Sequence, residues 1–221
     1  MRYKTLNSWD ITPVEAVRIQ EELRQLVVLR DDFQEIRTVA GVDVGLSKSQ
    51  DMATGGVVVL SFPDLVVMEC ASASKPVTFP YIPGLLAFRE IPAILAAFEK
   101  LTIEPDLLIV DGQGLAHPRR FGIACHLGLL IDRPSIGCGK TRLVGKYEEP
   151  GIEPGSSSVL VDDSERVGSV VRTKLRTKPV FVSPGHKINF ETAERMVLEC
   201  AKGYRLPEPV RLAHNLVSSS K

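Results

Sequence analysis

The sequence predicts an α/β protein in which a mixed sheet is flanked by helices on both faces. After an N-terminal helical segment, three apolar, strand-like segments follow one another, joined by short turns. Helical segments and further short strands then alternate, an order that places helices on both sides of a sheet. A chain of 221 residues with 44% hydrophobic residues fits one large domain, so we treat residues 1–221 as a single unit.

The first elements are a helix and a three-stranded meander. Thr12, Pro13 and Glu15 form an N-cap signature with proline at the first helical position, which predicts a helix over residues 13–29. Apolar runs predict strands over residues 38–44, 55–62 and 65–72. A Pro-Asp turn between the last two strands indicates antiparallel pairing.

A proline-punctuated loop, SKPVTFPYIPG, follows the meander, and its prolines exclude regular secondary structure. The next elements are expected to be a helix over 85–100, a strand over 106–110, a helix over 118–130 and a strand over 135–137. Further short strands are predicted at 159–161, 167–171 and 180–182, and helices at 189–201 and 209–217, with Gly203 as a helix C-cap. A meander followed by helix, strand, helix and strand is the order of a ribonuclease H-like fold, in which the first and fourth strands are neighbours.

Composition excludes several protein classes. Lys and Arg number 27, as do Asp and Glu, so net charge favours no particular partner. No segment is apolar enough to span a bilayer, and the N-terminus lacks the order of a secretory signal. The four cysteines form no CxxC pair and lie in apolar segments, which indicates small core residues rather than zinc ligands or disulfides. We expect a soluble, cytoplasmic protein.

Three carboxylates are candidate metal ligands. Asp43 and Asp111 each close an apolar run, and Glu90 lies on the predicted helix between them. A single acid at a strand end is mostly a turn or capping residue. Two such acids plus a third on the intervening helix favour Mg²⁺, which binds a few carboxylate oxygens and keeps several waters.

GCGKTRL resembles part of a P-loop, but Pro134 stands where that motif needs its first glycine. A nucleoside triphosphatase is therefore not indicated. Lys140 in this segment stays open between a functional lysine and a solvated one. Of the histidines, we expect His126 to be structural, His117 is undecided, and His214 has no local motif.

A period-two basic run, VRTKLRTKP, covers residues 171–179. As a strand it would show its four cations on one face. Two interpretations are equally favoured: an edge strand protected from aggregation, or a ridge that contacts phosphates.

The chain also resembles the endonuclease V family, the deoxyinosine 3′ endonucleases. VAGVDV, FPYIPGLLAFRE, LLIVDGQGLAHPRRFGIACHLG, PSIGCGKTRL, VSPGHKI and RLPEPVRLAHNL stand in the order seen in that family, over residues 10–216. PYIPG and DGQGLAHPRRFG are the specific motifs. Where the family often has a VSY-like sequence after the first aspartate, this chain has Val44-Gly45-Leu46.

The resemblance implies a Mg²⁺-dependent repair nuclease, with Mn²⁺ as a substitute, that acts as a monomer on DNA containing deaminated purines. It nicks at the second phosphodiester bond 3′ of deoxyinosine, leaving 3′-hydroxyl and 5′-phosphate. Asp43, Asp111 and Glu90 then resemble metal ligands, with Lys140 and His214 as catalytic partners. Tyr81 resembles a wedge in place of an everted base; as an alternative, it covers the core edge. The resemblance places the following residues around the base: Gly84, Leu86, Gly112, His117, Gly122, Gly137 and Leu143.

Arg119 and Arg120 stay open between a functional role and a solvated helix N-terminus. At the level of the whole protein, one alternative is an endoribonuclease acting mainly on inosine in RNA. Another is a nucleic-acid-binding module with a degraded site, which predicts the loss of at least one carboxylate. All three carboxylates are present, so this module is disfavoured.

Overall fold

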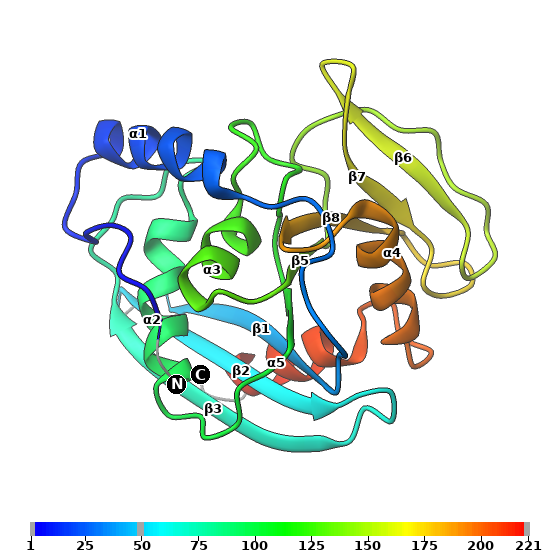
Figure 1. Ribbon diagram of the computed structural model, residues 1–221, viewed down its shortest axis with the longest axis horizontal. Coiled ribbons are helices and arrows are strands. Elements are labelled where there is room, and N and C mark those ends of the chain that lie inside the picture. The colour runs from blue at the N-terminus through cyan, green and yellow to red at the C-terminus, as the bar shows by residue number, and fades with distance from the viewer. Residues whose placement is uncertain (1–2, 48–50, 219–221) are drawn as a thin grey trace.

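The protein is built on one mixed eight-stranded sheet with the strand order β3-β2-β1-β4-β5-β8-β7-β6 (Figure 1). The computed structural model describes residues 3–47 and 51–218. The strands are β1 (Thr38–Ser47), β2 (Met52–Ser61), β3 (Val67–Pro76), β4 (Leu107–Val110), β5 (Ser135–Gly139), β6 (Ser157–Asp162), β7 (Glu165–Val171) and β8 (Val180–His186). The α-helices are α1 (Pro13–Leu23), α2 (Ala87–Phe98), α3 (Ile123–Ile131), α4 (Phe190–Glu199) and α5 (Glu208–Ser218).

The centre of the sheet is parallel and its two sides are antiparallel. β1 pairs in parallel with β4, and β4 with β5, so the predicted adjacency of the first and fourth strands is confirmed. The meander β1-β2-β3 and the strands β8-β7-β6 pair antiparallel. This ribonuclease H-like sheet brings the carboxyl ends of β1, β4 and β5 to one edge.

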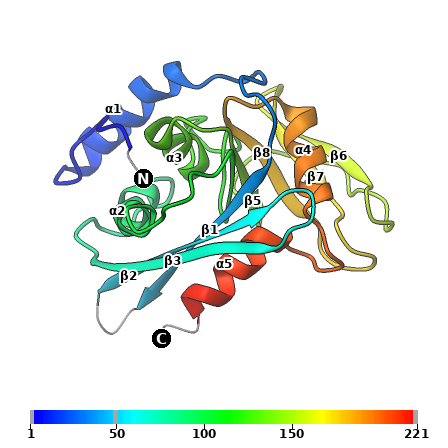
Figure 2. The same cartoon turned by 60° about the horizontal axis from the view of Figure 1, so that its bottom comes forward.

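Helices cover both faces of the sheet, as predicted. Figure 2 shows α2 and α3 on one face and α5 on the other. Alternate strand residues divide between two cores, because successive side chains in a strand point to opposite faces. Leu108 and Val110 pack with α2 and α3, whereas Leu107 and Ile109 pack with α4 and α5. In the described residues, no helix is both long and apolar enough to cross a membrane.

Three predicted boundaries are wrong in ways that matter for the site. β1 does not end near Asp43 but continues to Ser47, because β2 pairs with it along its whole length. The predicted helix over 118–130 begins only at Ile123, since Arg120 has a positive φ of 54° and its amide bonds the His117 carbonyl at 2.8 Å. α1 ends at Leu23 and gives way to a 3₁₀ turn, so the helix is shorter than the predicted 13–29.

The basic run is not a strand. β7 ends at Val171, and the chain then turns, with Arg176 at a φ of 56°. Arg172 is only 7% exposed, whereas Lys174, Arg176 and Lys178 are exposed, so the four cations do not share one face. The edge-strand interpretation is therefore wrong.

Two smaller expectations also fail. Three cysteines are buried and free, as expected, but Cys70 is exposed on β3, at the end of the sheet where no further strand follows. α4 ends with Cys200 as its C-cap, not Gly203. Gly203 instead has a φ of 76° in the connection to α5.

Candidate active site

The side chains of three predicted residues lie at the same edge of the sheet and point to the same face. The face of the sheet that packs against α5 includes two residues of β4, Leu107 and Ile109, and two of β5, Ile136 and Cys138. Because strand side chains alternate between faces, residues an even number of positions further along these strands also point toward α5. Asp111 follows β4 directly, and Lys140 follows β5 directly. Asp43 lies on β1, four residues after Val39 of the same core. The period of the strands therefore delivers all three side chains toward α5.

The cluster is completed by His214 from α5. Its Nδ1 lies 2.7 Å from Asp43 Oδ2, within hydrogen-bond distance. Lys140 forms an ion pair with Asp111, and its Nζ lies 3.4 Å from His214 Nδ1. One ligand atom each from Asp43, Asp111 and His214 lie within 4.8 Å of one another.

Glycines on the strands allow α5 to approach closely enough for this contact. A Cβ on Gly41 would lie 1.9 Å from the carbonyl oxygen of Pro209, at the start of α5. A Cβ on Gly56 would lie 2.5 Å from the Val217 side chain, near the end of that helix. Backbone and side chains of α5 therefore occupy the space where strand side chains would normally stand. This packing holds His214 over Asp43.

Glu90 reaches the cluster from α2. It lies outside the 4.8 Å group but close enough that Asp43 and Asp111 affect its ionisation. Burial, and then the negative charges of Asp43 and Asp111, raise the pKa of Glu90 to about 7. Burial and Asp43 also raise the pKa of Asp111, against the opposing effect of Lys140. The negative charges of neighbouring carboxylates repel one another, which disfavours their ionisation. A bound cation would relieve this repulsion, so such a cluster attracts a cation.

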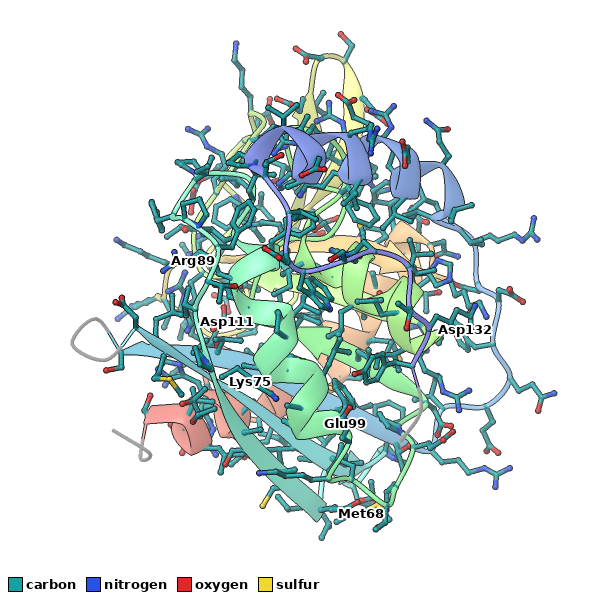
Figure 3. All side chains as sticks on the ribbon, turned by 90° about the vertical axis from the view of Figure 1, so that its left-hand side faces the viewer. Met68, Lys75, Arg89, Glu99, Asp111 and Asp132 are labelled. Atoms are coloured by element: carbon teal, nitrogen blue, oxygen red, sulfur yellow. The ribbon has the colours of Figure 1, made fainter. Side chains whose placement is uncertain are left out.

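A cavity of about 280 Å³ adjoins the carboxylates, and both Glu90 and Asp111 line it. In Figure 3 Asp111 lies on the same side of α2 as Arg89. Seven residues that the resemblance assigned to the lesion also line this cavity: Tyr81, Gly84, Leu86, Gly112, His117, Gly122 and Leu143. Tyr81 is 67% exposed at its rim, which disfavours the interpretation of this ring as a cover for the core.

Gly137 is the one predicted pocket residue that does not line the cavity. A Cβ at this position would lie 2.3 Å from the Gly114 amide nitrogen and 2.9 Å from the Gly112 carbonyl oxygen. Gly137 therefore lies behind the wall of the cavity and allows the 112–114 loop to pack against β5. Gln20, Gln113 and Arg142 also line the cavity. Gln113 and Arg142 lie within the DGQGLAHPRRFG and PSIGCGKTRL motifs but were not among the predicted site residues, and no quoted motif contains Gln20.

The wall of the cavity is held by a polar network around the Gly84 carbonyl. This oxygen accepts from Gln20 Nε2 at 3.1 Å, from Arg119 Nη2 at 2.7 Å and from His117 Nε2 at 2.9 Å. The Nδ1 of His117 accepts from the Arg119 amide, which fixes the tautomer with the proton on Nε2. Burial and the charge of Arg119 lower the pKa of His117 to about 4, so this donor stays neutral.

The two arginines beside His117 are not solvated at a helix N-terminus. Arg119 bonds Gln20 and Gly84. Arg120 forms ion pairs with Asp162 and Glu165, each at 2.8 Å, and so ties this loop to the β6–β7 hairpin. His126 is fully buried and bonds Asn7 at 2.8 Å, so the expectation that it is structural is confirmed.

The donor set fits a metal ion. Asp43 and Asp111 offer hard oxygen ligands and His214 an imidazole nitrogen, a combination suited to a divalent cation. Lys140 beside them adds positive charge for a phosphate group. The ribonuclease H-like sheet thus carries, at its carboxyl edge, a cluster suited to hold a divalent cation beside a phosphate group.

Comparison with known proteins identifies the family. The model of the family described as Endonuclease V matches residues 21–215. Endonuclease V of Nostoc punctiforme is 50% identical over 220 residues, covering 99% of this chain and all of the relative. The chain belongs to the endonuclease V family, and hence to the nucleases.

Solved structures agree with this assignment. Endonuclease V from Streptomyces avermitilis superposes with a TM-score of 0.92 at 42% identity, covering 96% of this chain and 94% of that one. Endonuclease V from Ciona intestinalis, in complex with a 23mer DNA containing an inosine followed by a ribo-adenosine, gives a TM-score of 0.82 at 31% identity. That match covers 95% of this chain and 98% of the other.

Proposed function

We propose that this protein is a Mg²⁺-dependent endonuclease that cuts DNA at the second phosphodiester bond on the 3′ side of a deoxyinosine, leaving 3′-hydroxyl and 5′-phosphate ends. One observation carries the proposal: the cavity of about 280 Å³ shares Glu90 and Asp111 with the carboxylate cluster. A purine base held in the cavity would place its own strand beside the cluster. The Ciona intestinalis protein, solved with inosine-containing DNA, supports this substrate class.

Asp43 and Asp111 would hold the metal, with Glu90 a ligand directly or through water. Mg²⁺ suits these oxygen donors, and Mn²⁺ accepts the same set. When bound, the ion neutralises charge on the phosphate and lowers the pKa of water. His214 would orient Asp43 through its 2.7 Å contact, and Lys140 would place its ammonium group beside the phosphate.

The cavity would discriminate the lesion by its base edge. Hypoxanthine has a 6-oxo group and an N1–H where adenine has an amino group and a bare nitrogen, so a backbone donor and acceptor can separate them. Glycines in the wall let the backbone approach that edge closely. Tyr81, exposed at the rim, would stack in place of the everted base.

A second candidate is an endoribonuclease acting on inosine in RNA, because the Ciona intestinalis complex holds a ribo-adenosine directly after the inosine. In either case we expect a monomer acting in the cytoplasm, and for DNA a role in repair of deaminated purines.

Cleavage of end-labelled strands tests the proposal. Matched DNA and RNA strands with one inosine each are incubated with enzyme, with Mg²⁺ or with EDTA. We expect a single Mg²⁺-dependent product whose length places the nick at the second bond 3′ of the lesion. Faster cleavage of the RNA would favour the second candidate. Cutting at unmodified positions, or cutting in EDTA, would overturn the proposal.

A further inference from the structure

A second, larger cavity adjoins the candidate active site at Lys140. It has a volume of about 1040 Å³ and lies between the loop after β5 and the loop between β7 and β8. Its lining contains a single carboxylate, Glu149, and six cationic residues: Lys140, Arg142, Arg172, Arg176, Lys178 and Arg205. We call it the basic groove. In a chain with as many acids as bases, this is a marked local excess of positive charge.

Two of the six cations are structural. The guanidinium of Arg172, only 7% exposed, donates to the carbonyls of Gly151 and Thr177 and pairs with Glu149. It therefore joins the 149–151 segment to the 172–178 loop across the groove. Its hydrogen-bonding capacity is used within the protein.

Arg205 has the corresponding role on the side of the active site. Its guanidinium donates to the carbonyls of Lys178 and Pro179, each at 2.9 Å, and to the carbonyl of Lys140. One side chain thus fixes the 172–178 loop relative to the segment that carries Lys140. The groove wall is held in a constant position with respect to the catalytic cluster.

Among the described residues, the other cations form no ion pair with a carboxylate, apart from Lys140, which pairs with Asp111. Arg142, Arg176 and Lys178 are exposed. The guanidinium carbon of Arg142 lies 5.9 Å from the centre of the Tyr147 ring. Arg142 lines both the groove and the cavity of about 280 Å³ beside the carboxylates, here called the base cavity. The groove therefore continues the base cavity through Thr141 and Arg142, with Lys140 at the junction.

We propose that the basic groove binds the phosphate backbone of the nucleic acid that flanks the lesion, through Arg142, Arg176 and Lys178. The inference rests on the proposed function, because it takes Lys140 as the point where a phosphodiester meets the catalytic cluster. Unpaired cations on fixed loops suit a polyanion of regular charge spacing, since phosphate contacts are electrostatic and independent of sequence. The groove supplies affinity for the strand, whereas the cavity supplies selection of the base.

Salt dependence of binding tests this assignment. The variant Arg176→Gln/Lys178→Gln is compared with a matched control, Arg24→Gln/Arg30→Gln, whose two arginines are exposed and outside the groove. Affinity for an undamaged oligonucleotide is measured in EDTA at several salt concentrations. Loss of two phosphate contacts should reduce the slope of log affinity against log salt by about 1.4 to 1.8. The control should keep the wild-type slope.

Substrate length gives an independent readout. Wild-type affinity should rise as nucleotides are added beside the inosine, until the groove is filled, and the groove variant should lose this gain. Equal slopes and equal length dependence in wild type and groove variant would overturn the inference and leave the surface free for another kind of partner. Because undamaged DNA is bound in EDTA, the result does not depend on cleavage at inosine, so failure of the proposed function would be seen separately.

Discussion

If Tyr81 takes the place of an everted base, replacing it with alanine should separate recognition of the lesion from the chemistry of cleavage. The side chain is 67% exposed and lines the rim of the base cavity. Arg89, whose guanidinium lies 5.9 Å from the centre of the Tyr81 ring, holds the loop by a backbone contact that the substitution leaves in place, since it donates to the Phe79 carbonyl at 2.6 Å. Folding stability should therefore change by no more than about 0.5 kcal/mol, as for other surface substitutions.

The expected effect on binding follows from stacking. A base stacked on an aromatic ring contributes about 1–3 kcal/mol, so Tyr81→Ala should weaken binding to duplex inosine DNA about 5- to 150-fold. The loss should be smaller for a single strand, where less unstacking has to be offset. Tyr81→Phe keeps the ring and should bind like the wild type.

Single-turnover cleavage of duplex inosine DNA is the assay. With enzyme in large excess, Tyr81→Ala should recover much of the wild-type rate, because the ring carries no charge and lies at the rim. A rate still thousands-fold low at saturating enzyme would refute the wedge interpretation and place Tyr81 in the chemical step. Equal losses for Tyr81→Ala and Tyr81→Phe would assign the effect to the hydroxyl.

Two further predictions concern packing and pH. Gly41→Ala would set a Cβ 1.9 Å from the Pro209 carbonyl oxygen, so urea denaturation should show a loss of about 3 kcal/mol in the free energy of unfolding. In the control Gly45→Ala, the added Cβ would lie 3.2 Å from the Val217 carbonyl oxygen, so the loss should be smaller. Equal losses in the two variants would contradict the close approach of α5 to Gly41. Burial lowers the pKa to about 4, about 3 and about 4 for His117, His126 and His186. The folded state then binds fewer protons, so each contributes stability that is present near pH 7 and is lost below about 6.5, by about 2 kcal/mol at pH 5. The raised pKa of Glu90 opposes this loss, so the total pH dependence of the wild type does not isolate the histidines. The free energy of unfolding in urea is therefore measured as a function of pH for the wild type and for His126→Gln. The same pH slope in both proteins would contradict the prediction.

The fold was predictable because its signals are local. Apolar runs with a turn between them mark the meander, and the alternation of helix and strand that follows determines the parallel centre of the sheet. Boundaries were less predictable because neighbours decide them. β1 extends past Asp43 only because β2 pairs with it as far as Ser47, a contact that no local pattern in β1 contains.

The site was partly predictable for the same reason. Asp111 follows a short buried strand, which is visible in the sequence, and Glu90 lies on an evident helix. His214 has no local motif and was assigned only through family resemblance. Its position depends on α5 packing against Gly41, far away in the chain. The burial of Arg172 likewise depends on carbonyls of the 149–151 segment, so the period-two pattern could not decide between an edge strand and a phosphate-contacting ridge.

Mg²⁺-dependent cleavage by the aspartate variants tests the central claim most directly. Asp43→Asn and Asp111→Asn are each compared with wild type on a duplex containing one deoxyinosine, across a Mg²⁺ titration at saturating enzyme. Thermal melting should confirm that both variants fold. If the two carboxylates hold the catalytic metal, each variant should cleave about a thousandfold more slowly or worse, since several kcal/mol of charge stabilisation are lost. Cleavage by either variant at close to the wild-type rate would contradict the metal-site assignment.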